Sequence, residues 1–215
     1  MRRRHIGLLT LIIVLVAVVS VLSNIMSVAE LEGRAPRVDY VRGVASKLVN
    51  SGTLWAAVPF VAGAWSRRWW VGAVAGCAAA MASLVVHYGL GTIFGMFTPM
   101  DWVYNAQWFF LALVLCPLLG LMGFGSQRPG LIGDVLLFTV PVGALAEPLV
   151  TSLFTPWERL PWPDRYSDIT TGAVLVLAGA AGVVWAAREV RRRHTRLTPG
   201  GRRRAGGGSP RHARR

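Results

Sequence analysis

Charged residues are scarce in this chain of 215 residues: they make up 15% of it, whereas hydrophobic residues make up 53%. Soluble domains carry about 25% charged residues, so this balance excludes an ordinary water-soluble fold. Lysine is almost absent, because Lys47 is the one lysine among 23 basic residues. The preference for arginine, with the abundant alanine, glycine and valine, is typical of GC-rich bacterial coding and carries no chemistry of its own.

The motifs of metal sites and of common enzymes are also missing. The two cysteines, Cys77 and Cys116, each lie in the middle of an apolar run, which predicts free, buried thiols. There is no CxxC or Cys/His cluster, so we expect no metal site. There is also no G-x-S-x-G, no H-E-x-x-H and no phosphate-binding loop. The sequence therefore favours a non-enzymatic protein without a bound cofactor, and a membrane-embedded enzyme is the less favoured alternative.

Long apolar runs are what the sequence has instead. A helix rises 1.5 Å per residue, so roughly 20 apolar residues cross a hydrocarbon core of about 30 Å. Six runs approach or exceed this length, which predicts an all-α, polytopic membrane helix bundle. The expected spans are residues 6–28, 48–65, 69–91, 108–124, 131–154 and 169–187.

The first run has a second interpretation, as a signal peptide. Ser27-Val28-Ala29 has small residues at the two positions that a cleavage site requires. However, the run is longer than the 7 to 15 apolar residues typical of a signal peptide, which favours an uncleaved helix. If residues 1–29 were removed, five spans would remain with the same orientation.

The distribution of basic residues predicts the orientation. When the loops alternate from a cytoplasmic start, 17 basic residues fall inside and six outside. Cytoplasmic loops carry the excess of arginine and lysine, so both termini should be cytoplasmic and the protein should lie in a bacterial inner membrane.

Eleven of the inside arginines lie in the tail, residues 188–215. The tail is rich in glycine and has no aromatic residue to stack on bases. We therefore expect a disordered cytoplasmic tail that contacts anionic lipid, and we do not expect it to bind nucleic acid.

Two spans carry small residues at four-residue spacing. Gly72, Gly76 and Ala80 lie in the third span, and Ala178, Gly182 and Ala186 lie in the sixth. Small residues at this spacing let helices approach closely. These stripes predict helix packing.

A candidate polar site follows from the depth of two ionisable residues. On the predicted topology, His87 lies roughly 27 Å and Glu147 roughly 24 Å from the cytoplasmic edge, at 1.5 Å per residue. Asn50, Ser51 and Tyr88 lie at a similar level. An ionisable group at membrane depth is costly, so it predicts a functional site, and a proton shared between His87 and Glu147 would lower that cost.

The alternative is that these side chains only join helices. Interhelical hydrogen bonds in membranes contribute about 0.6 kcal/mol each on average, and many have no further role. Asp134 is interpreted differently, because it lies about one turn from the cytoplasmic edge. We expect its carboxylate to reach the interface or to pair with Arg128.

Several short motifs resemble a known family. They are Asn50-Ser51-Gly52-x-x-Trp55, Gly63 followed by Arg67-Arg68, the pair His87-Tyr88, and Ala146-Glu147. Together they are similar to a family of small multi-pass membrane proteins of high-GC Gram-positive bacteria, whose function is unknown. The resemblance runs from about residue 49 to 150. It implies a membrane bundle and assigns no activity.

The function expected from the sequence is small-solute binding or a transport-associated role, at an outward-facing site built from Glu147 and His87 with Asn50, Ser51 and Tyr88 around it. Six spans are few for a complete transporter, so a membrane partner protein or a homo-oligomer is expected beside the surrounding lipid bilayer. The alternative is a structural or accessory protein that acts through its basic tail.

Overall fold

The computed structural model describes residues 3–155, 160 and 162–197. The described chain is all-helical, with no β-strand in these ranges, which confirms the all-α part of the predicted fold class. Its helices are α1 (Arg3–Ser23), α2 (Val28–Leu31), α3 (Pro36–Val49), α4 (Gly52–Ala64), α5 (Trp69–Ile93), α6 (Pro99–Tyr104), α7 (Ala106–Ser126), α8 (Leu131–Leu136), α9 (Thr139–Val150) and α10 (Trp162–Leu197).

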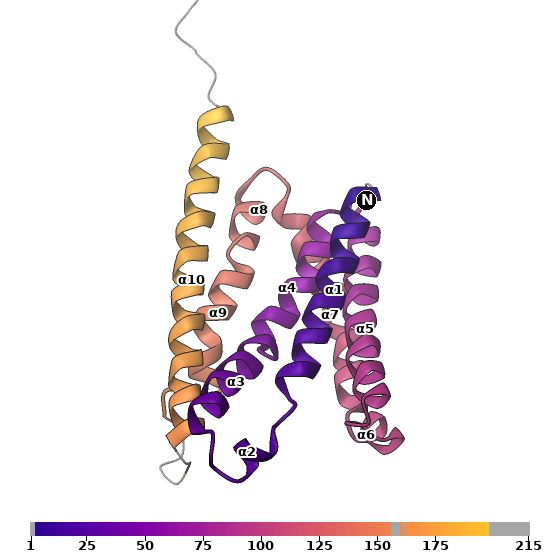
Figure 1. Ribbon diagram of the computed structural model, residues 1–215. Helices are drawn as coiled ribbons and strands as arrows, with labels where there is room; N and C mark the ends of the chain where they lie inside the picture. The colour runs from indigo at the N-terminus through magenta and orange to yellow at the C-terminus, as the bar shows by residue number, and fades with distance from the viewer. Residues whose placement is uncertain (1–2, 156–159, 161, 198–215) are drawn as a thin grey trace, which may run out of the picture.

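The chain runs back and forth between the two ends of a helix bundle (Figure 1). The start of α1, the loop between α7 and α8, and the end of α10 lie at one end, whereas α2 and α6 lie at the other. α7 packs against both α4 and α5, and α1 packs against α5. α10 is held by α9 and by α3.

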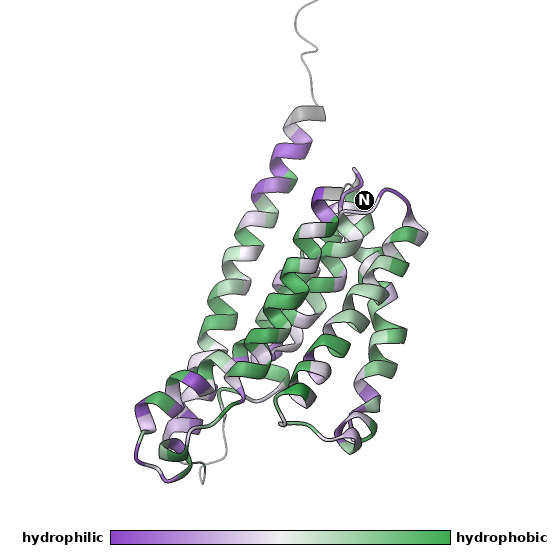
Figure 2. Ribbon diagram, turned by 45° about the vertical axis from the view of Figure 1, so that its right-hand side comes forward, coloured by the Kyte–Doolittle hydropathy of each residue, from purple (hydrophilic) through white to green (hydrophobic). Residues whose placement is uncertain are grey.

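Four helices are long and apolar enough to cross a membrane, judged by length and composition. This is the composition of a membrane protein, and Figure 2 shows hydrophobic residues covering most of the bundle. The four candidate spans match the predicted first, third, fourth and sixth runs with shifted bounds. They are Arg4–Ser23, Trp69–Ile93, Ala106–Ser126 and Trp162–Thr195.

The predicted spans 48–65 and 131–154 are not single long helices. The first corresponds to α4, which has 13 residues and begins only at Gly52. The second is divided into α8, with 6 residues, and α9, with 12. Pro141 explains this division, because it has no N–H to donate to the carbonyl of Leu137 and its ring crowds that carbonyl.

The arginine-rich tail begins as a helix. α10 continues to Leu197, so the prediction of disorder from residue 188 onward is wrong for residues 188–197. Residues 198–215 lie outside the described residues. Two acidic residues explain part of the extension: Glu189 pairs with Arg193 at a distance of 3.4 Å, and Asp134 of α8 contacts the last turns of α10.

Glycines bring α4, α5 and α7 into backbone contact. A Cβ atom added to Gly63 would lie 1.9 Å from the carbonyl oxygen of Gly120, and one added to Gly120 would lie 2.2 Å from the carbonyl oxygen of Gly72. One added to Gly76 would lie 2.6 Å from the carbonyl oxygen of Cys116. The small-residue stripe predicted in the third span is therefore the contact surface for α7. Cys77 and Cys116, which we predicted to be free and buried, are free but only half-buried.

The second stripe packs α10 on α9. A Cβ on Gly182 would lie 2.9 Å from the side chain of Pro141, and Ala186 is fully buried.

Polar contacts hold the other end of α10 to α3. Lys47 Nζ lies 2.7 Å from Asp168 Oδ1 and donates to Ser167 Oγ at 2.6 Å.

The short helix α2 is fixed by one buried carboxylate. Glu30 is 7% exposed and accepts from the backbone N–H of Ser27 at 2.7 Å and from Arg42 Nε at 2.6 Å. Arg42 also donates to Asp39 and to the carbonyl of Ser23, the last residue of α1. The bonds from Ser27, and then those from Arg42, lower the pKa of Glu30 from 4.5 to about 2.

We predict that Gly63→Ala destabilises the bundle, because the new methyl group would overlap the carbonyl of Gly120 and force α4 away from α7. Overpacking of this kind costs about 1 to 3 kcal/mol. Thermal unfolding in detergent measures the loss. Gly89→Ala is the matched control, since nothing lies within 4 Å of a Cβ at Gly89, and equal melting temperatures for the two variants would contradict the predicted contact.

We predict that Glu30→Gln lowers the melting temperature at pH 7 and that the difference from the unmodified protein shrinks in acid. A lowered pKa in the folded state stabilises the fold above the ordinary pKa of 4.5, and this contribution is lost as the pH falls from 4.5 toward 2. Melting temperatures at pH 7 and pH 3 test this prediction. Glu32→Gln serves as control, because Glu32 pairs with Arg34 at the exposed surface.

Candidate functional site

The site is built around a break between two helices. α3 ends at Val49 with Asn50 as its C-cap, and α4 begins at Gly52 with Ser51 as its N-cap. Ser51 is extended, with φ −62° and ψ 141°, and its hydroxyl accepts from the backbone N–H of Leu54 at 3.2 Å. The sequence Asn-Ser-Gly favours such a break, since Asn and Ser compete with helical hydrogen bonds. The first N–H groups of α4 then need acceptors from elsewhere.

Glu147 supplies these acceptors from α9. Its Oε1 accepts from the N–H of Gly52 at 2.7 Å, and its Oε2 accepts from the N–H of Thr53 at 2.8 Å. Each oxygen thus accepts one backbone hydrogen bond. The positive end of the α4 dipole favours a negative charge at this position. The half-buried carboxylate therefore joins α9 to the start of α4.

A second set of polar groups lies on the Asn50 side of the break. Ser20 of α1 donates to Asn50 Oδ1 at 2.5 Å, and its Oγ lies 3.0 Å from Nδ1 of His87 on α5. Asn50 Nδ2 donates to the carbonyl of Ser46 at 2.9 Å, which fixes the orientation of the amide. A hydroxyl has a single hydrogen, and Ser20 gives it to Asn50. This hydrogen-bond pattern assigns the ring proton of His87 to Nδ1, which then donates to Ser20 Oγ.

Aromatic rings surround the imidazole of His87. Trp55 meets it edge to face at a centroid distance of 5.9 Å, and Phe97 lies at 5.4 Å. Tyr88 contacts it at 5.1 Å and also packs against Phe97, Trp102 and Phe109. Tyr88 thus contributes through its ring, and no hydrogen bond of its hydroxyl occurs among the described residues. His87 is 8% exposed, whereas Asn50 is exposed, so the site opens at Asn50.

The break brings together all five residues selected from the sequence, but not by the contact that we expected. No hydrogen bond joins His87 to Glu147 within the described chain. Each has a different partner, because the N–H groups of α4 bind the carboxylate and Ser20 binds the imidazole. The sequence analysis missed Ser20 and the backbone of Gly52 and Thr53. Ser20 is one of three serines in the predicted first span, so the sequence offered only a weak signal for it.

Asp134 lies at the opposite end of the bundle and is 7% exposed. Its Oδ2 lies 2.9 Å from His194 Nε2, and its Oδ1 lies 3.9 Å from Arg193 Nη1. The predicted pairing with Arg128 is therefore wrong, since the guanidinium of Arg128 lies over the ring of Phe124 at 4.5 Å. The cause is the helical extension of α10, which carries Arg193 and His194 back to α8.

Comparison with known proteins gives one match. The model of DUF6518, a family of unknown function, matches residues 41–160, which is more than half of the chain. This chain belongs to the DUF6518 family. The match confirms the predicted resemblance to a family without an assigned function. No curated protein and no solved structure matches the chain.

The DUF6518 segment contains all five candidate residues, from Asn50 to Glu147. Ser20 and α10 lie outside it. The break between α3 and α4 and the carboxylate that caps α4 are therefore contained in the family segment, whereas the hydroxyl that binds His87 comes from α1.

We predict that Glu147→Gln destabilises the protein, because an amide presents only one acceptor oxygen and no charge to the N–H groups of Gly52 and Thr53. Hydrogen bonds to a charged group contribute about 1.5 to 3 kcal/mol. Thermal unfolding in detergent measures the loss. Glu189→Gln is the control, since surface pairs such as Glu189 with Arg193 contribute at most about 1 kcal/mol. Equal effects of the two substitutions would show that the carboxylate does not hold α4.

Proposed function

We propose that this DUF6518 protein crosses a bacterial inner membrane six times and binds a small polar solute at the break between α3 and α4. The six passes are α1, the end of α3 with α4, α5, α7, α8 with α9, and α10. Interrupted helices are tolerated at membrane depth where they are buried in protein or line a polar cavity. Both interrupted passes contribute to the site, through Asn50 and Glu147.

The proposed orientation places the arginine-rich end in the cytoplasm. This end carries the start of α1, the turn with Arg67 and Arg68, and the last turns of α10. The excess of basic residues at this end supports the orientation. The site at Asn50 then faces outward. The small bundle is proposed to act with a membrane partner or as a homo-oligomer.

The single observation that carries the proposal is the unused acceptor capacity at the break. A carboxylate can accept about four hydrogen bonds, and Glu147 accepts two from the backbone. Its other lone pairs have no hydrogen-bond donor among the described residues, and Asn50, two residues before Gly52, is exposed. A solute with N–H or O–H groups, such as an amine or a polyol, has the donors that these acceptors need.

An enzymatic role is not supported by the same geometry. Ser20, His87 and Asn50 contain the residue types of a nucleophilic triad. However, Ser20 is fully buried, and its hydrogen goes to Asn50 rather than to the imidazole. A nucleophile must instead be reachable and give its hydrogen to the base.

A structural role is the second candidate, and the two bonds from Gly52 and Thr53 to Glu147 favour it. In that case the carboxylate only joins α9 to α4, and solutes do not enter. The protein would then act through other surfaces, such as its basic tail.

Thermal unfolding of the purified protein against amines, polyols, amino acids and inorganic ions separates the two candidates. A solute that binds the folded protein stabilises it by mass action, by about 2.7 kcal/mol at a concentration 100 times its Kd. The melting temperature rises as a result. We expect Asn50→Ala and His87→Gln to remove this shift, and Glu32→Gln to keep it. Two results would contradict the proposed solute site: no compound stabilises the unmodified protein, or a stabilising compound acts equally on all variants. The structural role would then remain.

A further inference from the structure

One face of α10 is apolar and uncovered over several turns. α3 contacts the first turns of α10, through Lys47 with Ser167 and Tyr40 with Thr170. Beyond that contact, Leu177 is 70% exposed, Val184 49% and Trp185 57%. Side chains three, four and seven residues apart share one side of a helix, so these residues form a continuous strip. We name it the α10 strip, comprising residues 177, 181, 184 and 185.

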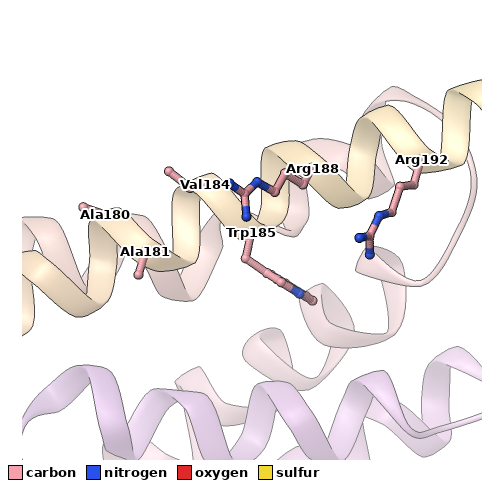
Figure 3. Close-up of a pocket in the computed structure, with 6 residues that line it drawn as sticks. All are labelled: Ala180, Ala181, Val184, Trp185, Arg188 and Arg192. Atoms are coloured by element: carbon pink, nitrogen blue, oxygen red, sulfur yellow. The ribbon is translucent and has the colours of Figure 1, made fainter.

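The strip leads to two arginines at the cytoplasmic end proposed above. Arg188 and Arg192 follow Trp185 by three and seven residues, so they lie on the same side of α10. With Ala180, Ala181, Val184 and Trp185 they line an open groove of about 440 Å³. Figure 3 shows Arg188 directed back along α10 toward Val184, whereas Trp185 and Arg192 project on one side of the helix.

These two arginines have no acidic partner among the described residues, and both are exposed. The carboxylates near this end of α10 have other partners. Glu189 pairs with Arg193, and Asp134 contacts Arg193 and His194. The groove therefore carries two positive charges without internal compensation.

The position along α10 matches the level of lipid headgroups. Residues 169–187 contain no charged side chain, and 19 residues at 1.5 Å each span roughly the hydrocarbon thickness. Arg188 is the first charge after that stretch. Trp185 precedes it by one turn, at the level where tryptophan is enriched in membrane proteins.

We propose that this groove binds one anionic phospholipid. The phosphate lies between Arg188 and Arg192, which can donate to its oxygens in forked geometry, and the indole of Trp185 lies beside the glycerol region. An acyl chain covers the α10 strip. Charge complementarity selects an anionic headgroup, and the adjoining apolar strip selects a lipid over free phosphate. The proposal does not depend on the solute site, which lies at the other end of the bundle.

Native mass spectrometry of the full-length protein in detergent tests the proposal. The probes are phosphatidylglycerol and phosphatidylcholine with identical acyl chains, each titrated into delipidated protein. We expect preferential retention of one phosphatidylglycerol. We also expect R188Q/R192Q to weaken that binding by roughly tenfold or more, because each arginine near an anionic surface adds to the attraction.

The double variant R67Q/R68Q is the charge-matched control. It removes two exposed arginines at the same end, from the turn between α4 and α5. An equal loss in both double variants would overturn the proposal in favour of general surface charge. Equal retention of the two lipids would also overturn it, as would competition by inorganic phosphate at the same concentration as the lipid. Melting temperatures without added lipid establish that each variant is folded.

Discussion

A helix that begins inside an apolar bundle must find acceptors for its first N–H groups, and the structure depends on how α4 meets this requirement. An N–H group left without an acceptor in an apolar environment costs several kcal/mol. Glu147 bonds to the N–H groups of Gly52 and Thr53, and the same bonds solve the opposite problem of a carboxylate in an apolar helix. Two groups that would each be costly alone thus stabilise one another.

The rest of the bundle positions these two partners. Backbone contact through Gly63, Gly72 and Gly120 fixes α4 against α5 and α7. α9 reaches α4 because α10 supports it from the other side, where Gly182 lets Pro141 approach. Close packing by small residues therefore sets the distance across which the Glu147 side chain connects the helices.

The sequence predicted much of this arrangement, since its signals depend on composition and spacing. The small-residue stripes predicted close helix packing on α5 and α10, although not which helices would contact them. Glu147 and Asn50 were recognisable because polar side chains within apolar runs need partners. The backbone partner of Glu147 was not recognisable, because every residue has an N–H and only the break at Ser51 makes those of Gly52 and Thr53 available. For Asp134 we expected either the interface or Arg128, which is near in sequence, whereas the helical extension of α10 brings Arg193 and His194 to it.

The capping of α4 by Glu147 also has a consequence for biosynthesis. Gly52 and Glu147 are separated by 95 residues in the chain. A ribosome adds roughly 5 to 20 residues each second, so the start of α4 waits for seconds before its acceptor has been made. During that interval its N–H groups need water, the translocation machinery or lipid headgroups as temporary partners. The start of α4 can therefore make its final hydrogen bonds only after α9 has been synthesised.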